Sequence, residues 1–200
     1  MTWIKTVPYD EASGKLRKLF DRVKGPDNNV DNILLSHGLR PGTLDGHMAL
    51  YKNVLHHSGN TLPKWLLEAL GTYVSLMNRC SYCVEHHFIG MKRLLEDDER
   101  ADAIRGALEA GTPEAVFQGR EAALMNYAEL LTRTPHALEE SHINVLRENG
   151  LDDGQILEAN QVIAYFGYAN RTVLGLGVHT TGDILGLSPN SSDGDDWSHQ

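Results

Sequence analysis

Apolar residues recur along most of this chain at intervals of three and four positions, the spacing that places them on one face of an α-helix. The segment from Leu16 to Val23 is an early example, and Gly25-Pro26 should end that helix. Runs that alternate apolar with polar residues and end in hairpin turns, the pattern typical of strands, do not occur in the sequence. The pattern therefore predicts an all-α protein.

Two successive helices are predicted in the middle of the chain. The first opens at Pro63, because proline is favoured at the first helical position. Asn78-Arg79 should end it, so that the second helix begins within two residues of Ser81. This second helix should run to the acidic segment Glu96-Asp97-Asp98-Glu99, which we interpret as a solvated turn and not as a metal site.

Further helices are predicted on both sides of this pair. The patterns cover Asn32 to His37, a segment that opens at Pro41, Arg100 to Glu109, Arg120 to Thr132, and Glu139 to Glu148. The last long helix should open with Asp152 as N-cap and Gln155 three residues later, a capping box. We expect residues 1–187 to form one helical domain, and residues 188–200, which are rich in Ser, Asp and Gly, to be a disordered acidic tail.

The charge of the chain narrows the classes of partner. Its 200 residues include 18 Lys and Arg against 27 Asp and Glu, a formal net charge of −9. No basic stripe is available to neutralise phosphates, so we do not expect nucleic acid as a partner. No stretch approaches the roughly 20 apolar residues that span a bilayer, and the N-terminus lacks the apolar core of a signal peptide. We expect a cytoplasmic protein without a membrane partner.

Cys80 and Cys83 are the two cysteines of the chain, and they form a Cys-x-x-Cys segment. A disulfide between them would close a loop too short to remove much entropy from the unfolded chain, so a purely stabilising role is disfavoured. In a reducing compartment such a pair indicates redox chemistry or metal binding.

Helical spacing would place Cys80, Cys83 and His87 within roughly 60° of one another on one face. His86 is rotated from His87 by about 100°, so we expect one of the two imidazoles to serve the thiols. Glu68 lies twelve residues before Cys80, which is about 18 Å along one continuous helix. It can face His87 only if the chain turns at residues 78–79 and the second helix runs antiparallel to the first.

This arrangement suits thiol chemistry. A thiol reacts with a peroxide or a disulfide as the thiolate, and a helix N-terminus, an imidazole or a second thiol lowers its pKa. Glu68 would orient His87, which would act as the base. We predict that Cys83, four residues from His87, is the thiol that attacks peroxide, and that Cys80, which we expect to be the more exposed, resolves the intermediate. The helix dipole favours the opposite assignment, with Cys80 as the attacking thiol, because its positive end stabilises a thiolate most strongly at Cys80.

The spacing of Glu68, eleven residues, Cys80-Ser-Tyr-Cys83, three residues and His87 resembles the active site of alkylhydroperoxidase D-like proteins, a branch of the carboxymuconolactone decarboxylase superfamily. Gly71-Thr-Tyr-Val-Ser, Asn170-Arg171 and Gly175-Leu-Gly-Val are similar to the peroxidase-related subgroup. The resemblance implies a helical bundle with the cysteines at the start of a central helix, and assembly into trimers or hexamers. It also implies reduction of a small hydroperoxide, with regeneration by a dithiol or protein reductant and without a cofactor or metal. It does not carry over the decarboxylase activity.

The sequence departs from that pattern at one position. The residue before the second cysteine is often His in alkylhydroperoxidase D, and here it is Tyr82. An imidazole relay at this position is therefore not expected, although the phenol can still donate a hydrogen bond. Tyr82 and His86 are kept as candidate supporting residues.

Other interpretations use the same residues. Cys80, Cys83, His87 and His86 could hold zinc in a non-enzymatic module, although the usual distal pair of zinc ligands is missing. A thiol sensor or disulfide exchanger without peroxidase turnover is a further alternative. The remaining candidates are interpreted as structural residues: His37, His47, His56-His57, and Asn170 with Arg171, which we expect to hold helices or subunits together.

Overall fold

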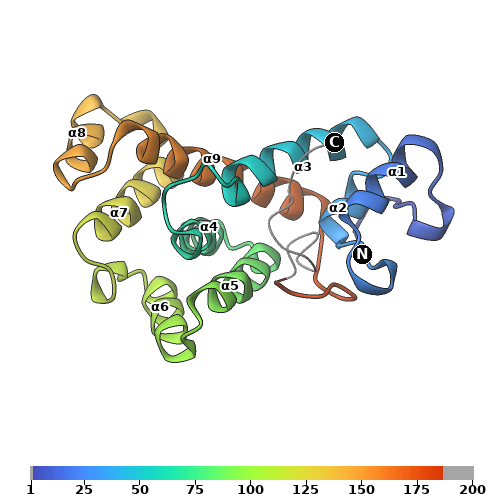
Figure 1. Cartoon of the computed structure of the whole chain (residues 1–200), viewed down its shortest axis with the longest axis horizontal. Helices are drawn as coiled ribbons and strands as arrows, with labels where there is room; N and C mark the ends of the chain where they lie inside the picture. Colours follow the sequence, from blue (N-terminus) through green and yellow to red (C-terminus); the bar gives the residue numbers. More distant parts are fainter. Residues whose placement is uncertain (1, 187–200) are drawn as a thin grey trace.

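The computed structural model describes residues 2–186, and this part of the chain contains helices and no β-strand (Figure 1). The α-helices are α1 (Gly14–Val23), α2 (Asn32–Ser36), α3 (Pro41–Tyr51), α4 (Lys64–Met77), α5 (Ser81–Leu95), α6 (Asp98–Ala110), α7 (Arg120–Arg133), α8 (Glu140–Glu148) and α9 (Asp153–Leu176). Short 3-10 turns lie at Tyr9–Glu11, Pro26–Asn28, Pro113–Ala115 and Pro135–Ala137, and a π-helical turn at Lys52–His56. The all-α prediction is confirmed. The tail predicted at 188–200 lies outside the described residues.

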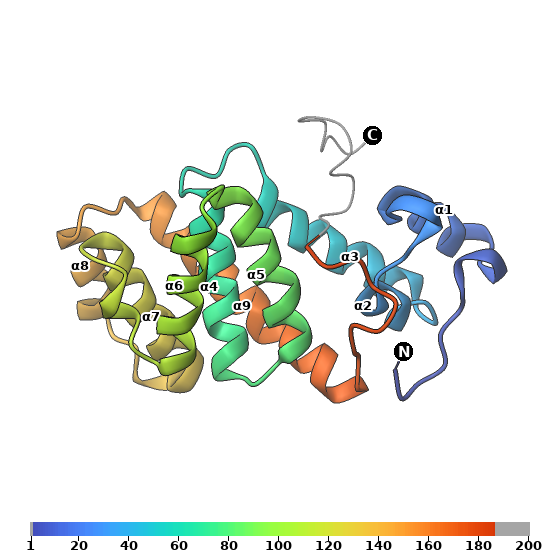
Figure 2. The same ribbon diagram turned by 90° about the horizontal axis from the view of Figure 1, so that it is seen from below.

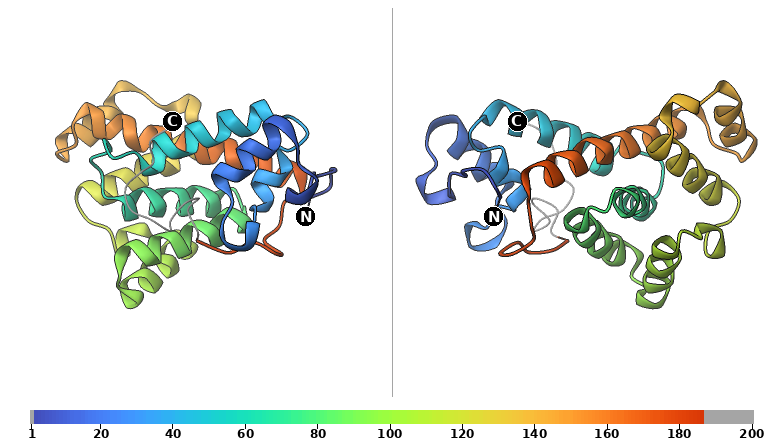
Figure 3. Two further views of the ribbon diagram at one scale, coloured as in Figure 1. Left: turned by 45° about the vertical axis from the view of Figure 1, so that its right-hand side comes forward. Right: turned by 180° about the vertical axis from the view of Figure 1, so that it is seen from behind.

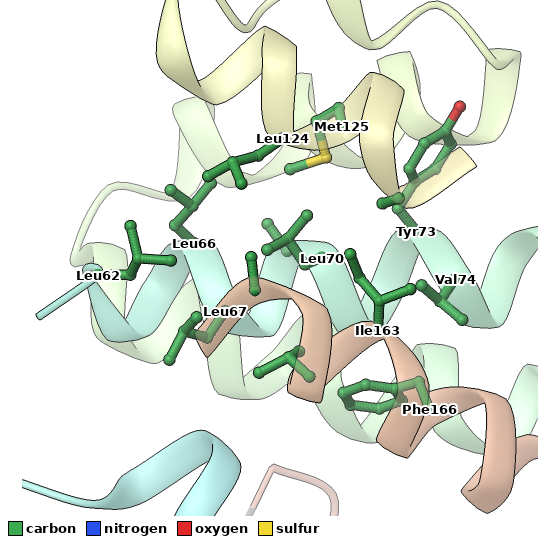
Figure 4. Close-up of a cluster of buried hydrophobic side chains, with 14 of the residues drawn as sticks. Leu62, Leu66, Leu67, Leu70, Tyr73, Val74, Leu124, Met125, Ile163 and Phe166 are labelled. Carbon is green, nitrogen blue, oxygen red and sulfur yellow. The ribbon is translucent and has the colours of Figure 1, made fainter. Parts of the chain in front are cut away.

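Helix α4 lies at the centre of the main bundle, where Figure 1 shows it end-on with α5, α6, α7 and α9 around it. Ten consecutive residues of α4, from Leu66 to Ser75, are buried. Figure 4 shows the leucines of α4 packed between Leu124 on α7 and Ile163 on α9. A helix covered on every side needs apolar residues around its whole circumference, and the sequence of α4 supplies them. Glu68 is the one charged residue of this buried stretch, which also contains the polar Thr72 and Ser75.

Helices α4 and α5 form an antiparallel pair joined by a tight turn (Figure 2). Asn78 is the C-cap of α4, and Arg79 adopts the left-handed conformation, with φ of 57°. The N–H of Cys80 then donates to the carbonyl of Ser75 at 2.8 Å, and α5 begins at Ser81. The break therefore falls at the residues from which it was predicted, whereas α4 begins one residue after Pro63.

Helices α1, α2 and α3 form a second hydrophobic cluster at one end of the molecule, opposite α6, α7 and α8 (Figure 2). Phe20 and Leu44 are fully buried in it. Tyr51, the last residue of α3, packs against both this cluster and the main core. The end of α3 therefore lies beside α4 and α9, and residues at this place form one wall of the candidate site.

The segment after α9 returns to the N-terminal half of α5. Gly177 ends α9 in the left-handed conformation, with φ of 61°, and residues 178–186 then run between α2 and α5 (Figure 3). Asn32 at the start of α2 donates from Nδ2 to the carbonyls of His179 and Thr181, at 2.8 and 3.1 Å. Residues far apart in the sequence thus meet at the start of α5.

Two of the predicted helix boundaries can be compared directly. Asp152 caps α9 by accepting from the N–H of Gln155 at 2.8 Å, and the capping box is confirmed. The interpretation of residues 96–99 as a solvated turn is wrong for Asp98 and Glu99, which form the first turn of α6 behind the N-cap Asp97. Acidic groups interact favourably with the positive end of the helix dipole at that position. None of the helices described is long and apolar enough to cross a membrane.

Candidate functional site

Both cysteines are buried at the N-terminal end of α5. Cys80 is the N-cap residue and Cys83 lies in the first turn, and their Sγ atoms are 3.1 Å apart as free thiols. Cys80 is 0% exposed and Cys83 is 2% exposed. The prediction that Cys80 is the more exposed thiol is therefore wrong, because Val173 of α9 and Val178 pack over the start of α5.

The short sulfur–sulfur contact couples the ionisation of the two thiols. The pKa of Cys80 is lowered, mainly by the hydrogen bond with Cys83. The same hydrogen bond, together with burial, raises the pKa of Cys83. One thiolate of the pair is thus stabilised by the S–H group that remains, and ionisation of both thiols at once is disfavoured.

Asn170 of α9 is fully buried beside the thiols. Its Nδ2 donates to Ser75 Oγ at 3.0 Å, and its Oδ1 accepts from Asn78 Nδ2 at 2.9 Å. Hydrogen bonding from Asn170 also lowers the pKa of both Cys80 and Cys83. Asn170 therefore holds α9 to α4, and it also touches the thiols, which the sequence analysis missed. The feature of the sequence that could have indicated this role is the position of a polar Asn170 on the apolar face of α9.

Glu68 and His87 face each other across the α4–α5 pair. Glu68 Oε2 lies 2.6 Å from His87 Nδ1. Gly90 leaves room for the carboxylate, because a Cβ at that position would lie 3.4 Å from Glu68 Cδ. The ring of Phe166 meets His87 edge-on, with ring centroids 4.5 Å apart. The structure thus brings together the carboxylate and the imidazole that the spacing predicted, and it fixes the ring one helical turn from Cys83.

Tyr82 and His86 contact a second carboxylate, that of Asp183, instead of the Glu68 pair. Tyr82 donates from its hydroxyl to Asp183 Oδ2 at 2.6 Å, and the backbone N–H of Asn32 donates to both carboxylate oxygens at 3.0 and 3.1 Å. His86 Nε2 lies 3.3 Å from the same Oδ2. Burial is the main cause that raises the pKa of Tyr82 well above its ordinary value, and the charge of Asp183 is the second cause. Tyr82 therefore remains a neutral donor that fastens the 178–186 segment to α5.

Asp31, the N-cap residue of α2, lies beside this cluster. Burial raises the pKa of its carboxyl group from 3.8 to about 6, and the nearby His86 acts in the opposite direction. Its side chain makes no capping hydrogen bond to α2. A carboxyl group that titrates close to neutrality thus lies next to the candidate site.

A cavity of about 270 Å³ joins these groups. Cys83, Glu68 and His87 line one part of its wall, whereas Cys80 does not line it. The apolar and aromatic part of the wall is formed by Ile33, Leu34, Met48, Tyr51, Leu94, Tyr165 and Ala169. A small molecule in the cavity would therefore meet Cys83 before Cys80.

His47 and His56, which we interpreted as structural, also line this cavity. Burial lowers the pKa of His47 to about 3 and that of His56 to about 4, so both imidazoles are neutral at neutral pH. His37 packs against His47, with ring centroids 5.0 Å apart, and does not line the cavity. No spacing in the sequence relates His47 and His56 to the thiols, because the packing of α3 on α9 brings them there.

The arrangement required for zinc is not assembled among residues 2–186, in which no group of three or more His, Cys, Asp and Glu side chains is placed to hold a metal ion. His87 contacts Glu68, and His86 contacts Asp183. Each of the two imidazoles thus contacts a carboxylate. The site that remains is a dithiol beside a carboxylate–imidazole pair.

Comparison with solved structures shows that this helical bundle has the alkylhydroperoxidase D-like fold. No protein-family model and no curated protein sequence matches the chain. Solved structures do match. The alkylhydroperoxidase AhpD core of an uncharacterized peroxidase-related protein from Ralstonia eutropha superimposes with a TM-score of 0.79 and 21% identity, over 94% of this chain and 97% of that one.

Two further structures show the range of proteins that share the fold. An uncharacterized peroxidase-related protein from a Silicibacter species matches with a TM-score of 0.77 and 22% identity, over 90% of this chain and 91% of that one. The debrominase Bmp8 matches with a TM-score of 0.68 and 19% identity, over 90% of each chain. A variant of Bmp8 has been solved in complex with 2,3,4-tribromopyrrole. The resemblance drawn from the sequence is thus confirmed for the fold.

Proposed function

We propose that this protein is a dithiol hydroperoxide reductase, with Cys83 as the attacking thiol and Cys80 as the resolving thiol. The observation that carries the proposal is that Cys83 lines the same cavity as the hydrogen-bonded Glu68–His87 pair, while its sulfur lies 3.1 Å from that of Cys80. Nucleophile, base and resolving group are therefore within about two turns of α5. The resemblance to peroxidase-related proteins supports the same conclusion.

The first step is attack by the Cys83 thiolate on the terminal oxygen of the hydroperoxide. The sulfur–oxygen bond forms, the O–O bond breaks, and Cys83 becomes a sulfenic acid while an alcohol leaves. Glu68 holds His87 through Nδ1, so Nε2 is the nitrogen available to take the thiol proton and return it to the departing alkoxide. In this role Glu68 positions the base.

The second step is attack by the Cys80 thiol on the sulfur of the Cys83 sulfenic acid, which yields a disulfide and water. The two sulfurs are 3.1 Å apart and must approach to about 2.05 Å, so the disulfide needs only a small local movement. An external dithiol or protein reductant then reduces this disulfide and is itself oxidised, which restores both thiols. Each turnover transfers two electrons from that reductant to the hydroperoxide.

The depressed pKa of Cys80 is compatible with attack by Cys83. The hydrogen bond between the sulfurs lets the proton pass from one to the other, so a thiolate formed at Cys80 can be exchanged for one at Cys83. The substrate in the cavity then reacts with the thiolate that it can reach. Asn170 supports both states, because it lowers the pKa of each thiol.

The function is tested by titrating free thiols after one equivalent of an organic hydroperoxide. We expect the loss of both thiols in the native chain and, in Cys83→Ser, retention of the Cys80 thiol. Retention of both thiols in the native chain would contradict the proposal. Oxidation of both thiols without turnover under any dithiol or protein reductant would instead favour a thiol sensor.

A second candidate function is reductive dehalogenation. The fold is shared with a debrominase, and the cavity has aromatic walls at Tyr51 and Tyr165. Two thiols would become a disulfide while a carbon–bromine bond is replaced by a carbon–hydrogen bond and bromide leaves. Release of bromide from a bromopyrrole, measured beside consumption of hydroperoxide at equal concentrations, distinguishes the two activities.

We also propose that the protein self-associates, as the resemblance implies for trimers or hexamers. Leu157 and Tyr168 are exposed on α9 and, at a separation of eleven residues, lie on the same face of that helix. Their burial against another subunit would remove apolar surface from water. Light scattering at micromolar concentration tests this proposal, and a monomer would contradict it.

A further inference from the structure

Two exposed cations, Lys64 and Arg93, line the cavity. The side chain of neither residue forms an ion pair or hydrogen bond with any other residue between positions 2 and 186. This contrasts with Lys92 and Arg105, which are both paired with carboxylates. In a chain with a formal net charge of −9, two unpaired cations at one cavity are a local positive site.

The antiparallel geometry of α4 and α5 places both cations at the same end of the cavity. Lys64 precedes Glu68 by one helical turn, about 6 Å along α4. Arg93 follows His87 by six residues, about 9 Å along α5, and follows Cys83 by ten residues, about 15 Å. The two helices run in opposite directions, so both displacements point away from the thiols. The cations therefore mark the end of the cavity opposite Cys83.

Much of the rest of the wall is uncharged. Tyr51, Met48, Leu94 and Tyr165 supply aromatic and aliphatic surface there. Burial lowers the pKa of His56 to about 4, and the charge of Lys64 acts in the same direction to a smaller extent, so this imidazole adds no positive charge. A ligand that fills the cavity would thus meet apolar surface along its length.

Two acidic groups also line the cavity, and Glu68 lies one helical turn from Lys64. Glu68 is hydrogen-bonded to His87, and Asp31 lies beside His86 near the start of α5. These carboxylates disfavour an anionic group next to the thiols. The charges of the wall therefore orient an anionic ligand with its charged end at Lys64 and Arg93.

We propose that Lys64 and Arg93 bind a carboxylate, and that the preferred substrate is an amphipathic organic hydroperoxide with a carboxylate at one end and the peroxide at the other. This inference rests on the proposed function. The carboxylate is unchanged by the reaction, in which the hydroperoxide and the two thiols become an alcohol, water and a disulfide. Its role is to bring the peroxide to Cys83 with the apolar part of the molecule against Tyr51 and Leu94.

The first test compares the hydroperoxide of a medium-chain carboxylic acid with that of its methyl ester. We expect the native chain to oxidise its thiols faster with the acid at low concentration. Lys64→Gln with Arg93→Gln should reduce this preference about three- to tenfold, because the rate with the acid falls more than the rate with the methyl ester. Lys18→Gln is the matched control, because Lys18 is an exposed cation on α1 that does not line the cavity. Salt at about 1 M should also reduce the preference.

The second test measures binding without peroxide chemistry. The hydroxy acid that corresponds to the reduced substrate, and its methyl ester, are titrated into the reduced protein by calorimetry. Tighter binding of the acid that is lost in the double variant supports the site, even if the protein fails to consume hydroperoxides and the proposed function falls. Equal binding of acid and ester, or a preference that the double variant retains, overturns the inference and leaves the reductase proposal standing.

Discussion

Phe166 connects the packing of α9 to the imidazole of His87. The two rings meet edge-on at 4.5 Å, and the same phenylalanine ring occupies the space that a Cβ at Gly71 would need. Gly71 therefore lets α9 approach α4 closely enough for Phe166 to reach across to α5. The position of the candidate base is set by the core as well as by its carboxylate partner.

Gly71→Ala should therefore damage both stability and activity. The added methyl group must displace Phe166, at a cost of about 1 to 3 kcal/mol in the free energy of unfolding, and His87 loses the ring that holds it. Urea denaturation and the rate of thiol oxidation measure the two effects. Gly106→Ala on α6 is the control, because no atom lies near a Cβ there, and it should stabilise the helix by about 0.5 to 1 kcal/mol. Equal effects of the two changes would contradict this account.

Glu68→Gln should slow thiol oxidation by about 10- to 100-fold while keeping the shape of the side chain. The amide is neutral, so it no longer stabilises the imidazolium that forms when His87 takes a proton. The rate as a function of pH is the decisive readout, because a merely structural role would not shift the profile. Glu129→Gln, on a carboxylate of α7 that pairs with Arg133, is the control and should leave the profile unchanged.

The two cysteines should differ when their sulfenic acids are trapped. In Cys80→Ser, one equivalent of hydroperoxide should leave a sulfenic acid on Cys83 that a dimedone-type probe labels. In Cys83→Ser, Cys80 should stay largely unlabelled, because it is fully buried and does not line the cavity. Mass spectrometry of the labelled chains checks both results. The reverse labelling would exchange the two roles and leave the dithiol chemistry intact.

Asp31 should make stability depend on pH. Its carboxyl group has a pKa of about 6 in the folded chain and 3.8 without burial, so between these values the folded state binds more protons than the unfolded state. The stability of the folded chain therefore falls as the pH rises through this window. Asp31→Asn removes the buried charge, and it should raise the free energy of unfolding by about 1 to 3 kcal/mol at about pH 8.

The same substitution should have little effect at about pH 3, where the carboxyl group is protonated in both states. Urea denaturation at the two pH values measures the difference. Asp153→Asn is a control for the loss of an acidic residue near a helix start, because Asp153 is exposed and pairs with Arg147. A native-like pH dependence in Asp31→Asn would show that another group is responsible.

The sequence predicted those parts of the site that depend on two adjacent helices. Glu68 and His87 are 19 residues apart, and one turn at Arg79 decides whether they meet, so helical spacing and a helix stop were sufficient. Asn170 and Asp183 could not be placed, because each comes from a distant element whose position depends on packing. The exposure of Cys80 was mispredicted for the same reason, since residues of α9 and the segment after it cover the start of α5.

The hydrogen bond between Tyr82 and Asp183 joins residues that are 101 positions apart. A ribosome synthesises Cys80 and Cys83 well before it reaches Val178 and Asp183, and domains tend to fold from the N-terminal side as they emerge. The helix pair that carries the dithiol can therefore form while both sulfurs are still uncovered. The growing chain holds two accessible thiols, whereas in the finished chain Cys83 lines the cavity and Cys80 does not.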